Sequence, residues 1–197
     1  PGPTCSPDPA LKRVMTKLYV MVGLPGSGKT TYARRSLGGA LRVSLDDLRL
    51  MLSGRTFDAR IEPAVAVAGE AVLEALARHA AKAGRDLVFD ATNVTRDRRA
   101  APIALARKHG LSPVAVYVEC PLPVAQSRNA RRAVPVPSEV VRGFDERLEP
   151  PTAEEGFEQV VQVVAPAEEL GPATPVHGKH RPGQRRSGRS FPKDGGA

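Results

Sequence analysis

The protein has 197 residues, 41% of them hydrophobic and 25% charged, and its 29 Lys and Arg against 21 Asp and Glu give a formal net charge of +8. This length suits one globular domain, and no apolar run approaches the roughly 20 residues of a membrane-spanning helix. Two cysteines, Cys5 and Cys120, exclude a disulfide framework and favour a reducing, cytoplasmic location.

The two ends of the chain differ in composition from its middle. Four of the first ten residues are proline, so we expect residues 1–16 to be a flexible extension. Residues 169–197 are rich in Gly, Pro and basic residues, and we expect a disordered tail there. Within it, residues 171–197 hold six Lys or Arg and one acid, so five of the eight net charges belong to this segment. A folded domain is predicted over residues 17–168.

The first predicted strand, residues 18–22, leads into the strongest motif of the sequence. This segment fits G-x-x-x-x-G-K-T and opens a helix predicted over 29–37; it reads Gly23-Leu24-Pro25-Gly26-Ser27-Gly28-Lys29-Thr30. Its glycines let backbone N–H groups converge on phosphate oxygens, and the helix adds its positive N-terminal end. Lys29 can bridge the β- and γ-phosphates of ATP, and Thr30 can bind Mg²⁺. The alternative is a Gly-rich turn without a ligand.

Carboxylates follow the next two predicted strands. Asp46 comes after the strand at 41–45, and Asp90 after the strand at 87–89, with an Ala-rich helix predicted over 63–83 between them. The carboxyl ends of parallel strands share the sheet edge where the phosphate loop lies. A kinase needs an ionised carboxylate to accept the proton of the attacking hydroxyl, which Asp46 can provide. The alternatives are a helix cap for Asp46 and a strand-end turn for Asp90.

Two further features bear on the reaction. The residue after Asp90 is Ala91, where motor-type ATPases usually need Glu to activate water, so transfer is favoured over hydrolysis. Arg128 and Arg132 are four residues apart in a helix predicted over 123–132, so they would share a face. A lid that carries them would stabilise the transferring charge and exclude water, whereas the alternative is a solvated basic helix face.

The remaining predicted elements complete an α/β pattern, with helices at 96–109 and 138–148 and strands at 114–118 and 157–164. Continuous apolar strands separated by helices indicate a parallel sheet covered on both faces. We therefore expect a P-loop NTPase fold that is nucleoside-monophosphate-kinase-like and has a small arginine lid. The eight aromatic residues form no cluster in the sequence, which therefore indicates no base-stacking surface.

Four motifs in this order resemble the kinase domain of phage-type polynucleotide 5′-hydroxyl kinases, which are P-loop kinases of an AAA-type ATPase family. They are the loop Gly23 to Thr30, then Asp46-Asp47-Leu48-Arg49, Asp90-Ala91-Thr92-Asn93 and Arg128-Asn129-Ala130-Arg131-Arg132. The match covers roughly residues 17–148, and the last three motifs together are more specific than the loop. The resemblance implies Mg²⁺- and ATP-dependent phosphorylation of a DNA or RNA 5′-hydroxyl, in nucleic-acid repair.

The resemblance also implies roles for single residues. It makes Asp46 the general base, Arg49 a contact to the acceptor phosphate next to the 5′-hydroxyl, and Arg132 and Arg128 contacts to the ATP phosphates. It places Asp90, Thr92 and Asn93 at the acceptor site, where Asp90 organises the active site and meets Mg²⁺ only indirectly. Independently, the i, i+3 spacing of Asp46 and Arg49 puts them on one face of a short helix.

Departures from that family keep other functions open. We find no D-x-D-x-T motif of the phage enzyme's phosphatase domain, so any role in end healing would be that of the kinase alone or would need a separate phosphatase or ligase partner. Related P-loop kinases for nucleotides or other small molecules share the loop and the base, and they are the second hypothesis. A nucleic-acid-binding module with a regulatory ATP site, motivated by the basic tail, is the third. Two interpretations of Arg96, Arg98 and Arg99 are equally favoured: contacts to acceptor phosphates and a solvated helix face.

Overall fold

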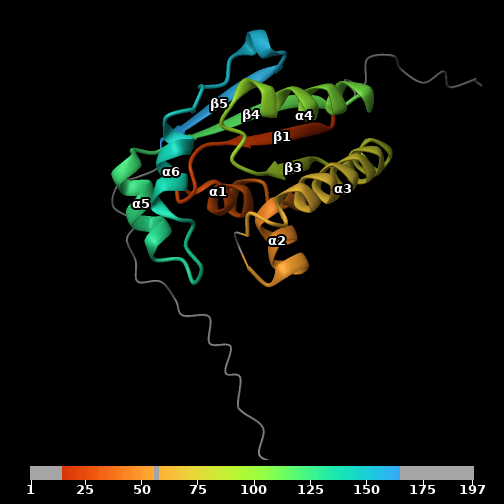
Figure 1. The fold of residues 1–197 in the computed structure, drawn as a ribbon. Helices are drawn as coiled ribbons and strands as arrows, with labels where there is room; N and C mark the ends of the chain where they lie inside the picture. Colours follow the sequence, from red (N-terminus) through yellow and green to blue (C-terminus); the bar gives the residue numbers. More distant parts are fainter. Residues whose placement is uncertain (1–14, 56–57, 165–197) are drawn as a thin grey trace, which may run out of the picture.

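The computed structural model describes residues 15–55 and 58–164, so most of the expected N-terminal extension and all of the expected C-terminal tail lie outside the described residues. Five strands form one parallel sheet of order β2-β3-β1-β4-β5 (Figure 1). Their bounds are β1 Lys17–Val22, β2 Leu41–Ser44, β3 Leu87–Asp90, β4 Ser112–Glu119 and β5 Gln159–Val164. Each predicted strand is present, and the α/β fold class is confirmed.

Six α-helices connect and flank the strands in the described part of the chain. They are α1 Lys29–Ser36, α2 Leu45–Ser53, α3 Glu62–Ala83, α4 Arg96–Lys108, α5 Leu122–Ala130 and α6 Ser138–Asp145. The strand expected to reach residue 45 ends at Ser44, because the Ser44 hydroxyl accepts the Asp47 N–H at 3.2 Å and so caps α2. Asp46 and Asp47 therefore occupy the first helical turn, and neither is the cap residue.

Alternating strand residues divide the core into two apolar clusters. Leu18 and Val20 of β1 belong to the cluster that includes side chains of α2, α3 and α4. Met21 and the half-buried Tyr19 belong to the cluster with Ala33 of α1. Because successive strand residues point to opposite faces, helices cover both faces of the sheet.

Four connections lie together at the carboxyl ends of the parallel strands. The phosphate loop follows β1, α2 follows β2, Asp90 ends β3, and α5 follows β4. Ser44 and Asp90 are register partners, and the Gly23 N–H donates to the Thr92 carbonyl at 3.0 Å, so the connections after β1, β2 and β3 lie close together. Among the described residues, no helix combines the length and apolar character that crossing a membrane requires.

Candidate active site

The phosphate loop is shaped by close backbone contacts that only glycine permits. Gly26 has φ +85°, and a Cβ at this position would lie 2.2 Å from the Ala125 carbonyl oxygen of α5. Any side chain at this position would thus collide with the backbone of α5 and would also strain the backbone of the loop. The loop and α5 are therefore held against each other by a position that must be glycine.

Lys29 lies under this loop and is 8% exposed. Its ammonium donates to the Leu24 carbonyl at 2.6 Å. Burial lowers the pKa of Lys29 to about 8, although the nearby carboxylates of Asp90 and Asp46 act in the opposite direction. The buried Ser27 hydroxyl has no hydrogen-bond partner in the described structure, and this orphaned donor fits a loop built to hold an anion.

Asp90 ends β3 within reach of the first turn of α1. Its Oδ2 accepts the Thr30 hydroxyl at 2.9 Å and Nη1 of Arg42 at 2.6 Å, and Arg42 also pairs with Asp47. Thr30 and Asp90 together offer the oxygen ligands that Mg²⁺ prefers. No group of three or more His, Cys, Asp or Glu that could hold a metal occurs within residues 15–55 and 58–164. The Thr30 hydroxyl and the Asp90 carboxylate would fit a Mg²⁺ ion whose other ligands would be phosphate oxygens and water.

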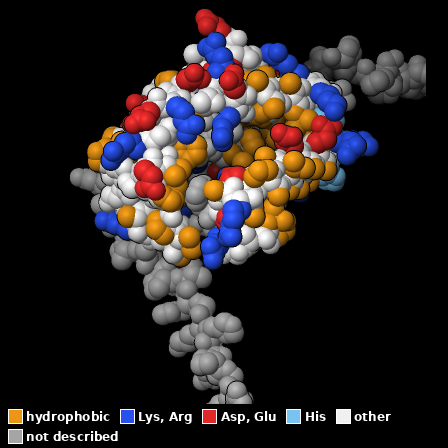
Figure 2. All heavy atoms as spheres, viewed as in Figure 1, with side chains coloured by type: hydrophobic (Ala, Val, Ile, Leu, Met, Phe, Trp, Pro, Cys, Tyr) orange, Lys and Arg blue, Asp and Glu red, His pale blue; other side chains and the backbone are white. Residues whose placement is uncertain are grey.

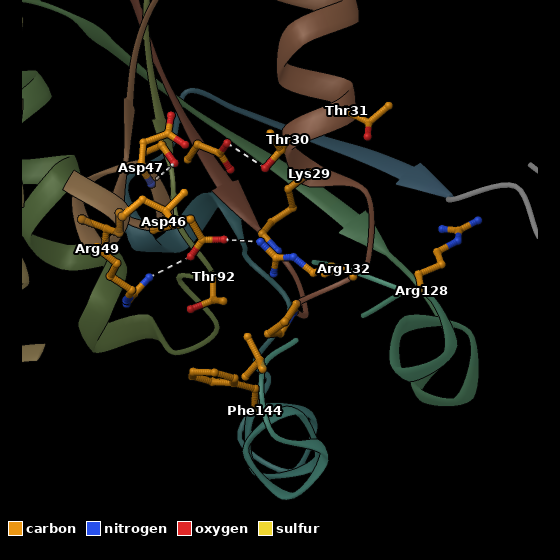
Figure 3. A pocket seen from close by; sticks show the side chains of 18 of the residues that line it. Lys29, Thr30, Thr31, Asp46, Asp47, Arg49, Thr92, Arg128, Arg132 and Phe144 are labelled. Atoms are coloured by element: carbon orange, nitrogen blue, oxygen red, sulfur yellow. Dashed lines mark hydrogen bonds and ion pairs between the residues drawn. The ribbon is translucent and has the colours of Figure 1, made fainter. Parts of the chain in front are cut away.

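Both carboxylate oxygens of Asp46 are held by arginines from different parts of the chain (Figure 3). Oδ1 accepts Nη1 of Arg49 at 2.8 Å, within α2, and Oδ2 accepts Nη2 of Arg132 at 2.7 Å, from beyond α5. Arg49 also donates through Nε and Nη2 to the two oxygens of Glu62, each at 2.8 Å. The predicted pairing of Asp46 and Arg49 on one helix face is thus observed.

Arg128 and Arg132 do not share a helix face. The predicted helix was too long: α5 ends at Ala130, so Arg132 lies in the following turn and reaches back to Asp46. Arg128 remains on α5, with Nη1 4.0 Å from Cys120 Sγ (Figure 3). The lid turn is fixed by Asn129, whose side chain exchanges hydrogen bonds of 2.7 and 3.1 Å with the backbone of Val136.

A cavity of about 590 Å³ joins these groups. The predicted site residues that line it are Pro25, Gly26, Lys29, Thr30, Asp46, Arg49, Asp90, Thr92, Arg128 and Arg132. Asn93 is placed elsewhere: it is buried, and its amide donates to the Met21 carbonyl at 2.8 Å. Its role in the structure is to hold the loop after β3 against β1.

Neither partner expected for Arg99 is observed. Its side chain is 0% exposed and forms an ion pair with Glu155, with Nε 2.7 Å from Oε2. Nη1 also donates to the carbonyls of Asn93 and Glu149 at 3.0 and 2.9 Å. Arg99 therefore holds the backbone behind the cavity, whereas Arg98 lines the cavity itself.

Several residues of the site were missed by the sequence reasoning. Arg42 and Glu62 support Asp90 and Arg49, and Phe144 and Arg147 of the α6 region line the cavity. A charged residue inside the apolar strand at 41–45 was a usable signal for Arg42. Glu62 and the α6 residues carried none, because only the folded chain brings them to the site.

A second cavity of about 760 Å³ lies between α3 and α4. Figure 2 shows the apolar hollow on this face, with charged side chains around it. It shares Leu45, Arg49, Glu62 and Arg98 with the first cavity. Its other charged lining residues are the acids Glu70, Glu74 and Asp97, so its rim does not favour a chain of phosphates.

Comparisons with known proteins identify the family and the fold of this chain. A family model described as an AAA domain matches residues 18–151, which contain every candidate site residue. A chain of the Pnkp1/Rnl/Hen1 RNA repair complex is similar with a TM-score of 0.57 and 22% identity, over 68% of this chain and 44% of that one. The protein therefore spans less than half the length of that repair chain.

Two further structures share the fold over most of their length. The APS kinase CysC of Mycobacterium tuberculosis, in complex with AMPPNP and APS, has a TM-score of 0.51 and 19% identity, over 75% of this chain and 88% of that one. Kti12 of Chaetomium thermophilum, in complex with ADP-AlF3, has a TM-score of 0.54 and 19% identity, with the same two coverages of 75% and 88%. At these identities the likeness shows a common P-loop NTPase fold.

Proposed function

This chain belongs to the AAA domain family, and from that premise we propose that it is an ATP-dependent phosphotransferase acting on the 5′-hydroxyl of DNA or RNA. One observation carries the proposal. Asp46 is held by Arg49 and Arg132 in the same cavity as Lys29 and the phosphate loop. A base, a phosphate clamp and an arginine from a lid are the parts that phosphoryl transfer needs.

The residues act on different atoms of the reaction. The backbone of the loop and the Lys29 ammonium would bind the β- and γ-phosphates of ATP. Arg132 would stabilise the charge on the transferring phosphoryl group, and Asp46 would accept the proton of the attacking hydroxyl. Mg²⁺, held at Thr30 and Asp90, would neutralise charge on the phosphates.

The polynucleotide acceptor is supported by the four-motif resemblance and by the similar chain from an RNA repair complex. Arg49 lines the cavity beside Asp46 and uses three of its five N–H donors on carboxylates. Two donors therefore remain for an acceptor phosphate.

A second candidate function is a kinase for a nucleotide or another small molecule. Asp46 and Glu62 both pair with Arg49, so little of the charge of this arginine is left for acceptor phosphates. The third hypothesis, a binding module with a regulatory ATP site, rests on the tail, which lies outside the described residues.

The first prediction tests the base. Asp46→Asn should lower turnover by about 10²–10⁴-fold, because the amide cannot accept the proton, and it should not weaken ATP binding. Transfer of labelled γ-phosphate to oligonucleotides, nucleosides and sugars measures turnover and identifies the acceptor class. Glu154→Gln, an exposed carboxylate outside the cavity, is the matched control. Transfer only to small acceptors would favour the second function, and transfer to none would reject the kinase.

A further inference from the structure

Phe144 is the only aromatic residue among the described side chains that line the active-site cavity. It lies on α6 and is half buried. Most of the remaining lining is charged or polar and suits phosphate groups. A phenyl ring contributes nothing to phosphate binding, but it provides a flat apolar surface for another ring.

Two further residues line the same cavity. The Cζ of Arg147 lies 5.5 Å from the Phe144 ring centroid, and its Nε donates to the Gly143 carbonyl at 2.6 Å, which fixes the guanidinium over the ring. Val136, which is 9% exposed, also lines the cavity and is held by Asn129. We call Phe144, Arg147 and Val136 the stacking platform, because aromatic rings and arginine planes are the groups on which nucleobases stack.

The platform lies on the acceptor side of the cavity. Figure 3 shows Phe144 on the side of Asp46 and Thr92, whereas Thr31 and Arg128 lie on the other side of Lys29. In phosphoryl transfer the attacking and leaving oxygens are roughly in line, so the acceptor enters on the side of the base and ADP leaves on the opposite side. Phe144 would therefore be next to the acceptor and remote from the adenine of ATP.

We propose that Phe144, together with Arg147 and Val136, stacks the base of the nucleotide that receives the phosphate, so that the site selects nucleobase-bearing acceptors over sugars. This inference rests on the proposed phosphotransferase function. It adds a source of selectivity that does not depend on acceptor phosphates, which fits the balanced charge of Arg49.

The test compares a 5′-hydroxyl oligonucleotide with the same oligonucleotide whose 5′-terminal residue is abasic. In the wild-type protein the abasic acceptor should have a KM about tenfold higher. Phe144→Ala and Phe144→Leu should raise the KM of the intact acceptor by about the same factor and leave that of the abasic acceptor and of ATP unchanged. Phe144→Tyr keeps the ring and should retain the wild-type preference.

A direct binding signal complements the kinetics. A 2-aminopurine base at the 5′ terminus should lose fluorescence on binding to the wild type and to Phe144→Tyr, and should keep it with Phe144→Leu. The stacking role would be overturned if the wild type had equal KM values for both acceptors. It would also be overturned if Phe144→Leu raised the KM of both acceptors equally. Neither result would affect the proposed phosphotransferase function. If the wild type transfers phosphate to no 5′-hydroxyl oligonucleotide, the proposed function fails first and the stacking role with it.

Discussion

At the scale of single residues, Lys29 shows how the fold adjusts a side chain for binding. Its ammonium is buried under the loop with one carbonyl acceptor, and burial lowers its pKa to about 8. A bound triphosphate would restore favourable surroundings for the positive charge and raise the pKa again. We therefore expect nucleotide binding to be coupled to proton uptake above pH 8.

The second prediction follows from that coupling. Above pH 8 the free protein loses the Lys29 proton, so the affinity for ATP should fall by roughly tenfold per pH unit. Calorimetric titrations between pH 7.5 and 9.5, in buffers with different ionisation heats, would measure both the affinity and the proton uptake. Lys29→Arg keeps its charge over this range, so it should bind ATP with little pH dependence. Equal slopes for the two proteins would contradict the assignment.

At the scale of elements, the buried pair of Arg99 and Glu155 joins α4 to the 3-10 turn Ala153–Glu155 that precedes β5. Burial alone would raise the pKa of Glu155, but hydrogen bonds from Arg99 and from the Thr152 backbone outweigh it and lower the pKa. The same guanidinium holds two backbone carbonyls. Arg99 thus connects the loop after β3 with the segment that leads to β5, an outermost strand of the sheet.

The third prediction concerns this connection. Arg99→Met leaves a buried carboxylate and two carbonyls without their donor, and should lower the free energy of unfolding by about 3–5 kcal/mol. Because the folded-state pKa of Glu155 is lowered, the stabilisation is complete above the unfolded pKa and is lost as the pH falls, so the difference from wild type should shrink towards pH 4.

Urea unfolding at pH 7 and pH 4 measures this difference. Arg60→Met is the matched control, because Arg60 is 81% exposed in its pair with Asp58. Its unfolding midpoint should stay close to wild type. A similar loss in both variants would show that the buried pair has no special role.

The fourth prediction uses the contact between the phosphate loop and α5. Gly26→Ala should abolish ATP binding, because its Cβ would collide with the Ala125 carbonyl at 2.2 Å. Gly28 also has a positive φ, but a Cβ there meets nothing within 4 Å, so Gly28→Ala suffers backbone strain alone. Nucleotide titration of both variants compares the two effects, and equal losses would argue against the collision.

The elements were largely predictable from the sequence, because buried parallel strands are continuous apolar runs that glycines and helices interrupt. The errors occurred where local and tertiary preferences compete. The residues through Arg132 are good helix formers, yet the chain leaves the helix at Ala130 so that Asn129 can hold Val136. The cap of α2 is Ser44 rather than an aspartate, which left both aspartates free to form ion pairs.

At the scale of the whole molecule, the shared edge of a parallel sheet explains why four distant motifs meet in one cavity, and this meeting was predictable. Apart from the pair of Asp46 and Arg49 within α2, the pairing of carboxylates with arginines was not predictable, because it depends on side-chain packing across α2, α3 and the lid. The second cavity was also invisible in the sequence, since it combines residues of α2, α3 and α4. The residues of the stacking platform lie close together in the sequence, but only the fold shows that they line the cavity.

The fifth prediction concerns the distribution of charge over the molecule. Removal of residues 171–197 takes away five net positive charges and no candidate site residue. If the enzyme acts on polynucleotides, the shortened protein should keep its turnover number, while the KM of an oligonucleotide becomes less sensitive to salt between 50 and 200 mM. Complete loss of transfer would instead support the binding-module hypothesis.

In the proposed reaction, the ion pair between Arg132 and Asp46 would determine the order in which the two substrates bind. The guanidinium that would clamp the transferring phosphate is the one that holds the base, so ATP must compete with Asp46 for it. Arrival of the nucleotide thereby releases the carboxylate to accept a proton. An acceptor that arrives first meets a base whose oxygens are both engaged. With these proposed roles, the ion pair would act as a latch, and we expect a sequential mechanism in which ATP binds before the hydroxyl that it phosphorylates.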